Sequence, residues 1–586
     1  MQSALKNLNV KPFNSEILNS ELSTSKQISN YLPMTEQTKA TLRDSAKIRW
    51  IVLLFMAFAM FCSYIFMDIL SPIKDLMEST RGWDSTAFGT MQGSETFLNV
   101  FVFFLIFAGI ILDKMGVRFT AVLSGAVMLV GATINWYAVT DMFIGSGLET
   151  WFNNNLNYIP GFDELGISPF YQGMPASAKF AAVGFMIFGC GVEMAGITVS
   201  RGIVKWFKGR EMALAMGSEM ALARLGVATC MIFSPVFAKL GGNIDVSRSV
   251  AFGVVLLMIA LIMFVVYFFM DKKLDEQTGE AEEGDEPFKI SDIGQILTSS
   301  GFWIVALLCV LYYSAIFPFQ KYAVNMLQCN LTFTPPAADS FWATNTVTII
   351  QYIIMLIVAA AAFASNFSKE KGMKAGLQCL AVAALLVFCY MGYMRQSAET
   401  VFAVFPLLAV GITPILGNIV DKKGKAATML IMGSVLLILC HLTFAFLLPA
   451  MKDVNPTAGF LLAYLTILVL GASFSLVPAS LWPSVPKLVD AKIIGSAYAL
   501  IFWIQNIGLW LFPLLIGKVL DKTNPQLVAD LKAGLITPEQ AAVSYDYTAP
   551  LVMLACLGVA ALVLGIVLKV IDKKKGYGLE TPNMQK

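Results

Sequence analysis

Two side chains of opposite charge, Glu193 and Arg224, stand inside long apolar stretches of the sequence. Glu193 occurs in GCGVEMAGITVS (189–200) and Arg224 in SEMALARLG (218–226). Each lies about ten residues from one end of its apolar segment, which at ~1.5 Å per helical residue corresponds to a depth of ~15 Å. Because the hydrocarbon core of a bilayer is ~30 Å thick, both charges are expected near its middle.

An acid and a base at one depth permit two interpretations. A charge in hydrocarbon costs ~2.5 kcal/mol or more, so chains seldom keep one without a reason. In a zwitterion clamp, the Glu193 carboxylate receives an ammonium group and the Arg224 guanidinium, a planar fork of donors, receives a carboxylate. In a structural ion pair the two charges only neutralise one another, and such pairs often cost as much in desolvation as they return. The sequence leaves both interpretations open.

Five further polar residues in apolar segments are candidate substrate-binding residues. Asp68 could contribute to a cavity or an outer gate, or it could snorkel to the outer surface. Tyr312 and Tyr313 could line a cavity from the second half of the chain, although aromatic residues there more often pack. Gln505 and Asn506 form an amide pair that needs hydrogen-bond partners, either from a substrate or from neighbouring helices.

The composition indicates a membrane protein with many spans. Of the 586 residues, 57% are hydrophobic and 14% are charged, whereas soluble proteins carry about 25% charged residues. The net charge of +2 argues against nucleic-acid binding. The cysteines are scattered and His441 is the only histidine, so we expect neither a metal site nor a cofactor. No glycine-rich loop of the GxxxxGKS or GxxxxGKT type occurs, so we expect no ATP-hydrolysing enzyme.

Apolar segments of about twenty residues predict an all-α polytopic membrane protein with about fourteen transmembrane helices. Six segments precede an acid-rich stretch at 271–292 and eight follow it. We expect the spans near 48–71, 92–112, 119–140, 178–203, 213–239, 247–270, 301–327, 340–363, 376–394, 401–420, 426–449, 459–485, 493–517 and 549–571.

The distribution of Lys and Arg predicts the orientation of these spans. Basic residues are concentrated in alternate connections, such as 201–210 and 368–374, and none occurs between Arg118 and Lys179. Because cytosolic loops carry the excess of basic residues, we expect both termini in the cytosol and the 141–177 loop outside.

One short motif occurs twice, as GIILDKMGVR (109–118) and GNIVDKKGK (417–425). Glycine permits a close helix approach or a tight turn, and the Asp can cap or pair across neighbouring helix ends. We expect the Asp113 and Asp421 loops to act as cytosolic latches in an outward-open state. Their shared positions are Gly109, Asp113, Lys114, Gly116 and Arg118 in the first copy and Gly417, Asp421, Lys422, Gly424 and Lys425 in the second.

The doubled motif, the two halves and the acidic linker resemble the major facilitator superfamily, in which six-helix halves surround a midplane site. That family usually has twelve helices, so the resemblance assigns the surplus pair to an inserted hairpin at 328–400, with peripheral packing or an oligomer contact as its role. The expected domains are a cytosolic tail (1–46), an N-terminal bundle (47–270), an acidic linker (271–300), a C-terminal bundle with the hairpin (301–573) and a second tail (574–586).

Several stretches further resemble one branch, the lysosomal dipeptide transporter family (major facilitator superfamily domain-containing protein 1). They include GVEMAG, ALARLG, LYYSAIFPF (311–319), SLWPSVPKLV and GSAYALIFWIQNIGL. In that family a Glu and an Arg are thought to hold the two ends of the peptide, and they match Glu193 and Arg224. The resemblance implies an alternating-access transporter of dipeptides or similar small zwitterions. We expect a bacterial relative in the plasma (inner) membrane, without the lysosomal sorting.

Three other functions stay open at this point. The nearest is a carrier of organic anions or amino acids, with Arg224 as the carboxylate site and Glu193 as a proton site. The others are an exporter of drugs or metabolites, and a membrane receptor on the same fold that transports nothing. If Glu193 couples transport to protons, the carrier is a symporter. Without proton coupling, it is a facilitator.

Overall fold

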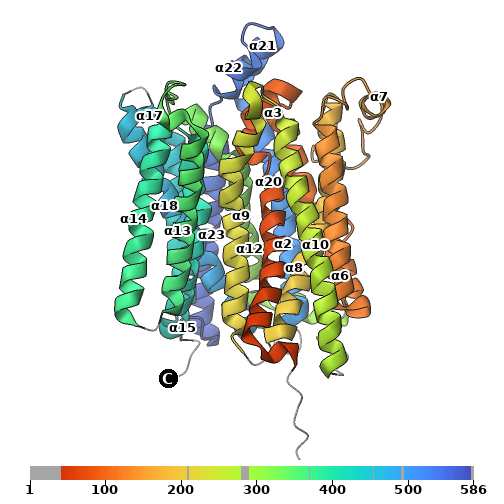
Figure 1. The fold of residues 1–586 in the computed structure, drawn as a ribbon, viewed down its shortest axis with the longest axis vertical. Helices are drawn as coiled ribbons and strands as arrows, with labels where there is room; N and C mark the ends of the chain where they lie inside the picture. Colours follow the sequence, from red (N-terminus) through yellow and green to blue (C-terminus); the bar gives the residue numbers. More distant parts are fainter. Residues whose placement is uncertain are drawn as a thin grey trace, which may run out of the picture.

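The computed structural model describes residues 41–207, 210–278, 290–368, 370–452, 454–489 and 494–582. Long helices run side by side along one axis (Figure 1). We call the end of the bundle at which α2 (Ala46–Met67) begins and α23 (Thr548–Lys575) ends the proximal face, which is at the bottom of Figure 1. The opposite end, which carries α7 (Gly147–Asn154), is the distal face.

The helices divide into two halves on either side of the linker. After α2, the first half contains α3 (Lys74–Arg81), α4 (Ser85–Gly93), α5 (Phe97–Phe101), α6 (Phe104–Ala138), α7, α8 (Ala176–Phe207), α9 (Met212–Ala238) and α10 (Val246–Thr278). The second half contains α11 (Ile290–Leu297), α12 (Ser300–Asn330), α13 (Asn345–Phe367), α14 (Lys371–Arg395), α15 (Ala398–Lys423), α16 (Ala426–Leu442), α17 (Leu448–Met451), α18 (Pro456–Leu481), α19 (Val485–Leu488), α20 (Ile494–Thr523), α21 (Pro525–Lys532), α22 (Pro538–Ala542) and α23.

Among the described residues, thirteen helical segments are long and apolar enough to cross a membrane, whereas the sequence predicted about fourteen. The difference lies at α6, which joins parts of the spans predicted near 92–112 and 119–140. Gly116 interrupts this helix with a φ of 79° and a ψ of 166°, a conformation open to glycine because it has no Cβ. The remainder of the span near 92–112 is divided between α4, the 3-10 turn η3 (Ser94–Thr96) and α5.

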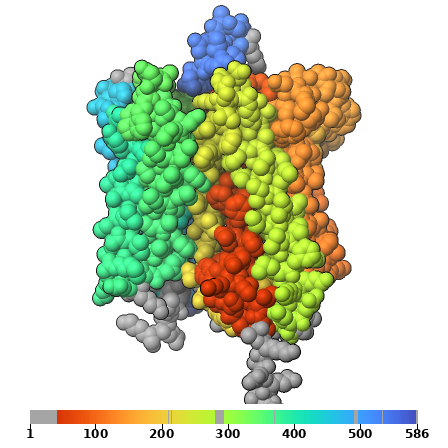
Figure 2. Space-filling model, viewed as in Figure 1, coloured from red at the N-terminus to blue at the C-terminus, as the bar shows by residue number. Residues whose placement is uncertain are grey.

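The inserted hairpin consists of α13 and α14, which pack against each other and against α15 at the edge of the second half (Figure 1). Helix α13 also reaches α9 of the first half. There the ring of Tyr352 meets that of Phe233 edge to face at 4.8 Å, and its hydroxyl lies 3.5 Å from that of Thr229. Figure 2 shows the surfaces of the hairpin and of α9 meeting on one side of the molecule. The hairpin is therefore peripheral, and it bridges the two halves.

A second contact between the halves is the close approach of α4 to α20. A Cβ built on Gly89 would lie 2.1 Å from the carbonyl oxygen of Pro513, and one on Gly517 would lie 2.0 Å from that of Ser85. Only glycine fits at such distances. The Tyr322 hydroxyl, from α12, lies within 3.0 Å of both of these carbonyl oxygens, so it can donate to either.

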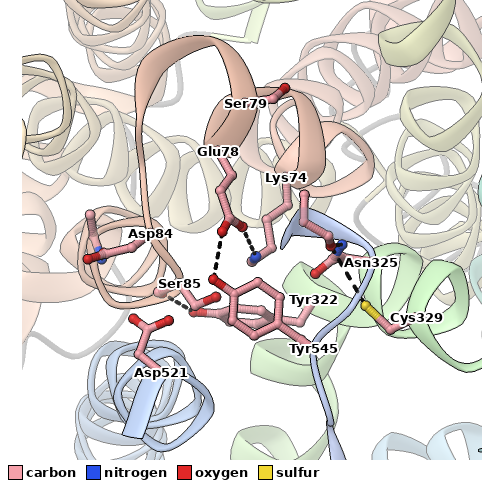
Figure 3. Close-up of polar contacts among 12 residues, drawn as sticks. Lys74, Glu78, Ser79, Asp84, Ser85, Tyr322, Asn325, Cys329, Asp521 and Tyr545 are labelled. Carbon is pink, nitrogen blue, oxygen red and sulfur yellow. Dashed lines mark hydrogen bonds and ion pairs between the residues drawn. The ribbon is translucent and has the colours of Figure 1, made fainter. Parts of the chain in front are cut away.

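Polar side chains hold the same distal ends together (Figure 3). A buried ion pair joins Lys74 to Glu78 at 3.0 Å, and the Tyr545 hydroxyl donates to Glu78 at 2.6 Å. Burial and the charge of Glu78 raise the pKa of Tyr545, so this phenol stays protonated as a donor. Asp521 accepts hydrogen bonds from the backbone N–H and the hydroxyl of Thr86 at 2.7 and 2.6 Å. We call these five residues, with Tyr322 and the α4–α20 contact, the distal latch.

Gly517→Ala is expected to open the distal latch, because the added methyl group cannot fit against Ser85. Overpacking of this kind costs about 1–3 kcal/mol. It destabilises only the closed arrangement, in which α4 and α20 are in contact. We expect faster labelling of Cys329, which is 5% exposed at the distal end of α12, by a water-soluble maleimide read by mass spectrometry. Gly147→Ala is the control, since nothing lies within 4 Å of its Cβ position. Equal labelling of both variants would contradict the role of this contact.

Candidate functional site

Glu193 lies on α8 and faces the second half of the chain. Its Oε1 accepts a hydrogen bond of 3.2 Å from Nδ2 of Asn506, on α20. The turn η3 packs against the same part of α8, since a Cβ on Gly189 would lie 1.9 Å from the carbonyl oxygen of Glu95. The only polar partner of the Glu193 carboxylate among the described residues is thus the uncharged amide of Asn506.

Arg224 lies on α9, the helix next to α8, and its guanidinium is surrounded by aromatic rings. The guanidinium carbon is 5.6 Å from the ring centre of Tyr64, and 5.0 Å from those of both Phe317 and Phe474. A cation over an aromatic face gains about 0.5–2 kcal/mol. Within the described part of the chain, Arg224 and Glu193 form no salt bridge with each other. The structure therefore shows two separately held charges.

Two carboxylates that the sequence did not single out as site residues belong to the same neighbourhood. Tyr64, from α2, is within electrostatic reach of Arg224 and Glu193, and also of Glu95 and Glu219. Glu95 follows α4 on η3, and Glu219 lies five residues before Arg224 on α9. A helix count treats the predicted span near 92–112 as one straight helix, so it places Glu95 at the outer end. The break at η3 instead brings Glu95 against α8.

The predicted residues of the second half divide into two groups. The Tyr313 hydroxyl accepts from Nε1 of Trp482 at 3.2 Å, and its ring packs 5.3 Å from that of Phe317, beside Arg224. Tyr312 instead points into the second half, where its hydroxyl donates to the backbone carbonyl of Leu430.

The amide pair of α20 is divided in the same way. Oε1 of Gln505 accepts from the thiol of Cys309 on α12, at 3.3 Å, within the second half. Asn506, the next residue, turns to the first half and reaches Glu193. The structure thus brings Asn506 and Tyr313 to the two charges and leaves Gln505 and Tyr312 in helix packing.

Asp68 does not snorkel to the surface. It is 1% exposed, and it forms a salt bridge of 2.9 Å with Lys321 of α12. Nε2 of Gln320 donates to its other oxygen at 2.6 Å, and Lys321 also donates to the carbonyl of Met67 at 2.7 Å. This buried cluster joins the first helix of one half to the first long helix of the other, on the distal side of the site.

The first copy of the motif forms ion pairs at the proximal face, all within the first half. Asp113 accepts from Arg201 of α8 at 2.6 Å, and Arg118 donates to Asp275 of α10 at 2.9 Å. Lys205 of α8 lies 2.7 Å from Asp275 as well. Lys114 is exposed, and a Cβ on Gly109 would meet nothing within 4 Å. The motif therefore ties α6, α8 and α10 together.

The second copy makes different contacts. Gly424 and Lys425 have φ angles of 71° and 68°, which form a turn into α16. The N–H groups of Lys425 and Ala426 donate to the carbonyls of Glu580 and Leu579 at 3.2 and 3.0 Å, so the segment after α23 binds this turn. Lys422 is exposed, and a Cβ on Gly417 would meet nothing within 4 Å. The side chain of Asp421 lies outside the described part of the chain.

Two helical halves that contact each other around separate charges, with thirteen helical segments able to cross a membrane among the described residues, are an arrangement typical of membrane transport proteins. The model of the Major Facilitator Superfamily matches residues 56–397. The chain therefore belongs to this superfamily, whose members are transporters and not enzymes.

Known proteins similar to this chain include two lysosomal dipeptide transporters. The lysosomal dipeptide transporter MFSD1 of Danio rerio is 24% identical over 485 residues, which cover 81% of each chain. The same transporter of Homo sapiens is 22% identical over 483 residues, covering 81% of this chain and 80% of the human one. The predicted resemblance to this branch is confirmed.

Two solved structures share the fold. A mutant of the nucleoside transporter NupG is 12% identical, with a TM-score of 0.55, and the match covers 88% of this chain and 99% of that one. A bacterial homolog of the human lysosomal transporter Spinster, in an inward-facing and occupied conformation, is 12% identical with a TM-score of 0.55, covering 90% and 98%. At this identity the likeness shows the fold alone.

Asp68→Asn is expected to destabilise the protein, because it leaves the Lys321 ammonium buried without a counter-charge. Breaking a buried pair in this way costs about 3–5 kcal/mol. Adding Lys321→Met to the same chain removes the orphaned charge, so the double variant should recover most of the loss. Unfolding in detergent, followed by tryptophan fluorescence, measures all three proteins. A double variant no more stable than Asp68→Asn would show that the pair is not the relevant interaction.

Proposed function

We propose that this protein carries dipeptides or similar small zwitterions across the membrane by alternating access. The observation that carries the proposal is the separate placement of Glu193 and Arg224 on adjacent helices. Among the residues that the structure describes, Glu193 has an amide as its partner and Arg224 is surrounded by aromatic faces. A ligand with a free ammonium and a free carboxylate would satisfy both charges at once.

The aromatic surroundings of Arg224 suit it to bind a carboxylate. Rings that pack against the flat faces of a guanidinium leave the N–H groups at its edge free for a bidentate acceptor. In a site from which water is excluded, such a charge-assisted hydrogen bond is about twice as strong as a neutral one. Tyr64, Phe317 and Phe474 would also contribute apolar surface for a substrate side chain.

The partner of Glu193 suggests how binding and movement are linked. Asn506 belongs to the second half, so its hydrogen bond to Glu193 joins the halves across the site. A substrate ammonium would compete with Asn506 for the same carboxylate. Binding would then replace a contact between the halves with a contact to the ligand. This replacement would shift the equilibrium between the outward-open and inward-open arrangements.

The orientation follows from the basic residues. The proximal face, which carries the pairs of Arg118, Arg201 and Lys205, would be cytosolic by the excess of positive charge. In the plasma membrane, both termini would then lie on the cytosolic side. The distal latch would lie on the outer side. With the latch closed, the structure would represent an arrangement sealed toward the outside. The similarity to lysosomal dipeptide transporters supports a dipeptide as the substrate.

Free-ended dipeptides are expected to stabilise the purified protein against heat. A ligand that binds only the folded state adds ~2.7 kcal/mol at 100 times its Kd, and blocking either peptide end removes one charge that the clamp needs. The panel contains dipeptides, their N-acetylated and C-amidated forms, single amino acids and dicarboxylates. Stabilisation should disappear in Glu193→Gln and fall strongly in Arg224→Lys, which keeps the charge but loses the fork.

The control is Lys371→Gln, an exposed residue at the proximal end of the hairpin, which should respond like the unmodified protein. Stabilisation by blocked peptides as well as free ones would contradict the clamp. Stabilisation by dicarboxylates alone would favour the second candidate, an organic-anion carrier in which Arg224 binds the carboxylate. The nearness of Glu95 to Glu193 gives that candidate its own support, because paired acids suit proton exchange.

A further inference from the structure

A cavity of about 810 Å³ lies at the distal face, away from the central charges. The distal ends of α9 and α15 line it, together with the hairpin and the segment that follows α12. It therefore opens between the two halves, on the side opposite the α4–α20 contact. A volume in this range suits a small organic ligand or a lipid headgroup.

Positive charge predominates in the lining of this cavity. It includes Lys239 from the end of α9, Arg395 from the end of α14 and Lys452. Two carboxylates oppose these three charges: Glu399 in the lining, and Asp75, which accepts a hydrogen bond of 3.2 Å from Nε2 of the lining residue Gln328. Within the described part of the chain, neither Lys239 nor Arg395 forms a salt bridge. Glu399 accepts a hydrogen bond from Ser397 at 2.7 Å. The site therefore has more positive than negative charge.

Two buried side chains of α13 supply donors without partners. Gln351 is 0% exposed and Thr348 is 3% exposed, and both line the cavity. Nη1 of Arg395 donates to Oε1 of Gln351 at 3.0 Å, so the oxygen of this amide is used and its Nε2 is free to donate. Among the described residues, neither Nε2 of Gln351 nor Oγ1 of Thr348 has a hydrogen-bond partner.

We propose that this cavity is a binding site for a phosphate group, carried by a phospholipid headgroup or by a soluble phosphate compound. The Arg395 guanidinium, held in place by Gln351, offers a planar fork that matches a phosphate. Nε2 of Gln351 and the Thr348 hydroxyl donate to its remaining oxygens, and Lys239 and Lys452 neutralise its charge. A buried donor left unpaired is costly, and such a ligand removes that cost at both positions.

The position of the site gives its occupant a role in the transport cycle. Lys239 comes from the first half, whereas Arg395, Gln351 and Thr348 come from the second. These groups meet only while the distal ends of the two halves are together. A bound phosphate group therefore stabilises the distally closed arrangement, whichever substrate the central site carries.

Thermal unfolding of the full chain in detergent tests the proposal, with no transport substrate present. The soluble probes are inorganic phosphate and glycerol phosphate, and the lipid probes are mixed micelles containing phosphatidylglycerol or the uncharged lipid diacylglycerol. We expect stabilisation that saturates with a phosphate-bearing probe and weakens as salt is added, because exposed charges are screened. Diacylglycerol should give none.

The variants separate this site from general effects of charge. Arg395→Gln should weaken the binding of the phosphate probe about tenfold or more, since it removes a charge-assisted hydrogen bond. Thr348→Val, which keeps the shape and removes only the donor, should weaken it by a smaller factor. Lys371→Gln, at the opposite end of α14, should bind as the unmodified protein does.

The outcomes are distinct. Saturable stabilisation by glycerol phosphate or inorganic phosphate identifies a soluble ligand, and stabilisation by phosphatidylglycerol alone identifies a lipid. No stabilisation by any phosphate-bearing probe overturns the proposal, as does undiminished binding by both Arg395→Gln and Thr348→Val. Failure of the dipeptide screen would leave this result unaffected, because no dipeptide is used.

Discussion

A charge buried between helices must be compensated, and for two such charges in this protein most of the compensation comes from the opposite half of the molecule. Glu193 belongs to the first half, and its hydrogen-bond partner Asn506 belongs to the second. Arg224 also belongs to the first half, and two of its three aromatic neighbours, Phe317 and Phe474, belong to the second. Separation of the halves around the site would therefore break these contacts.

The contacts at the distal face have a different character. The glycines of α4 and α20 allow backbone to approach backbone, and the ion pairs of Lys74 with Glu78 and of Asp68 with Lys321 are buried. Packing at this distance is lost completely after a small displacement, so it favours two distinct arrangements over a continuous range. The central site and the distal latch thus depend on the same relative position of the halves.

The sequence predicted those features that depend on counting along a helix. The two halves and the inserted hairpin follow from apolar segment lengths and from the repeated motif, and the depths of Glu193 and Arg224 in the membrane stay predictions. The break at η3 was not predicted, although the polar residues Ser94, Glu95 and Thr96 interrupt the apolar composition of 92–112 there. Glu95 was consequently assigned to a helix end, whereas it packs against α8.

Contacts between distant parts of the chain were beyond sequence reasoning. Asp68 permitted both a snorkelling and a gating interpretation, and its partner Lys321 follows only from the packing of the segment after α2 against α12. The two motif copies have the same residue spacing but differ in structure. The first forms ion pairs with α8 and α10, and the second binds the backbone of residues 579 and 580, which no repeat could indicate.

The hairpin has a consequence for the lipid that surrounds the protein. Helix α13 contacts both α9 and α15, so it lies over the seam at which those two helices of opposite halves meet. Acyl chains on that side face the apolar surface of the hairpin, which exposes Ile349 and Ile353, and not the seam itself. The hairpin therefore obstructs sideways entry of a lipid-soluble molecule from the bilayer into this part of the seam.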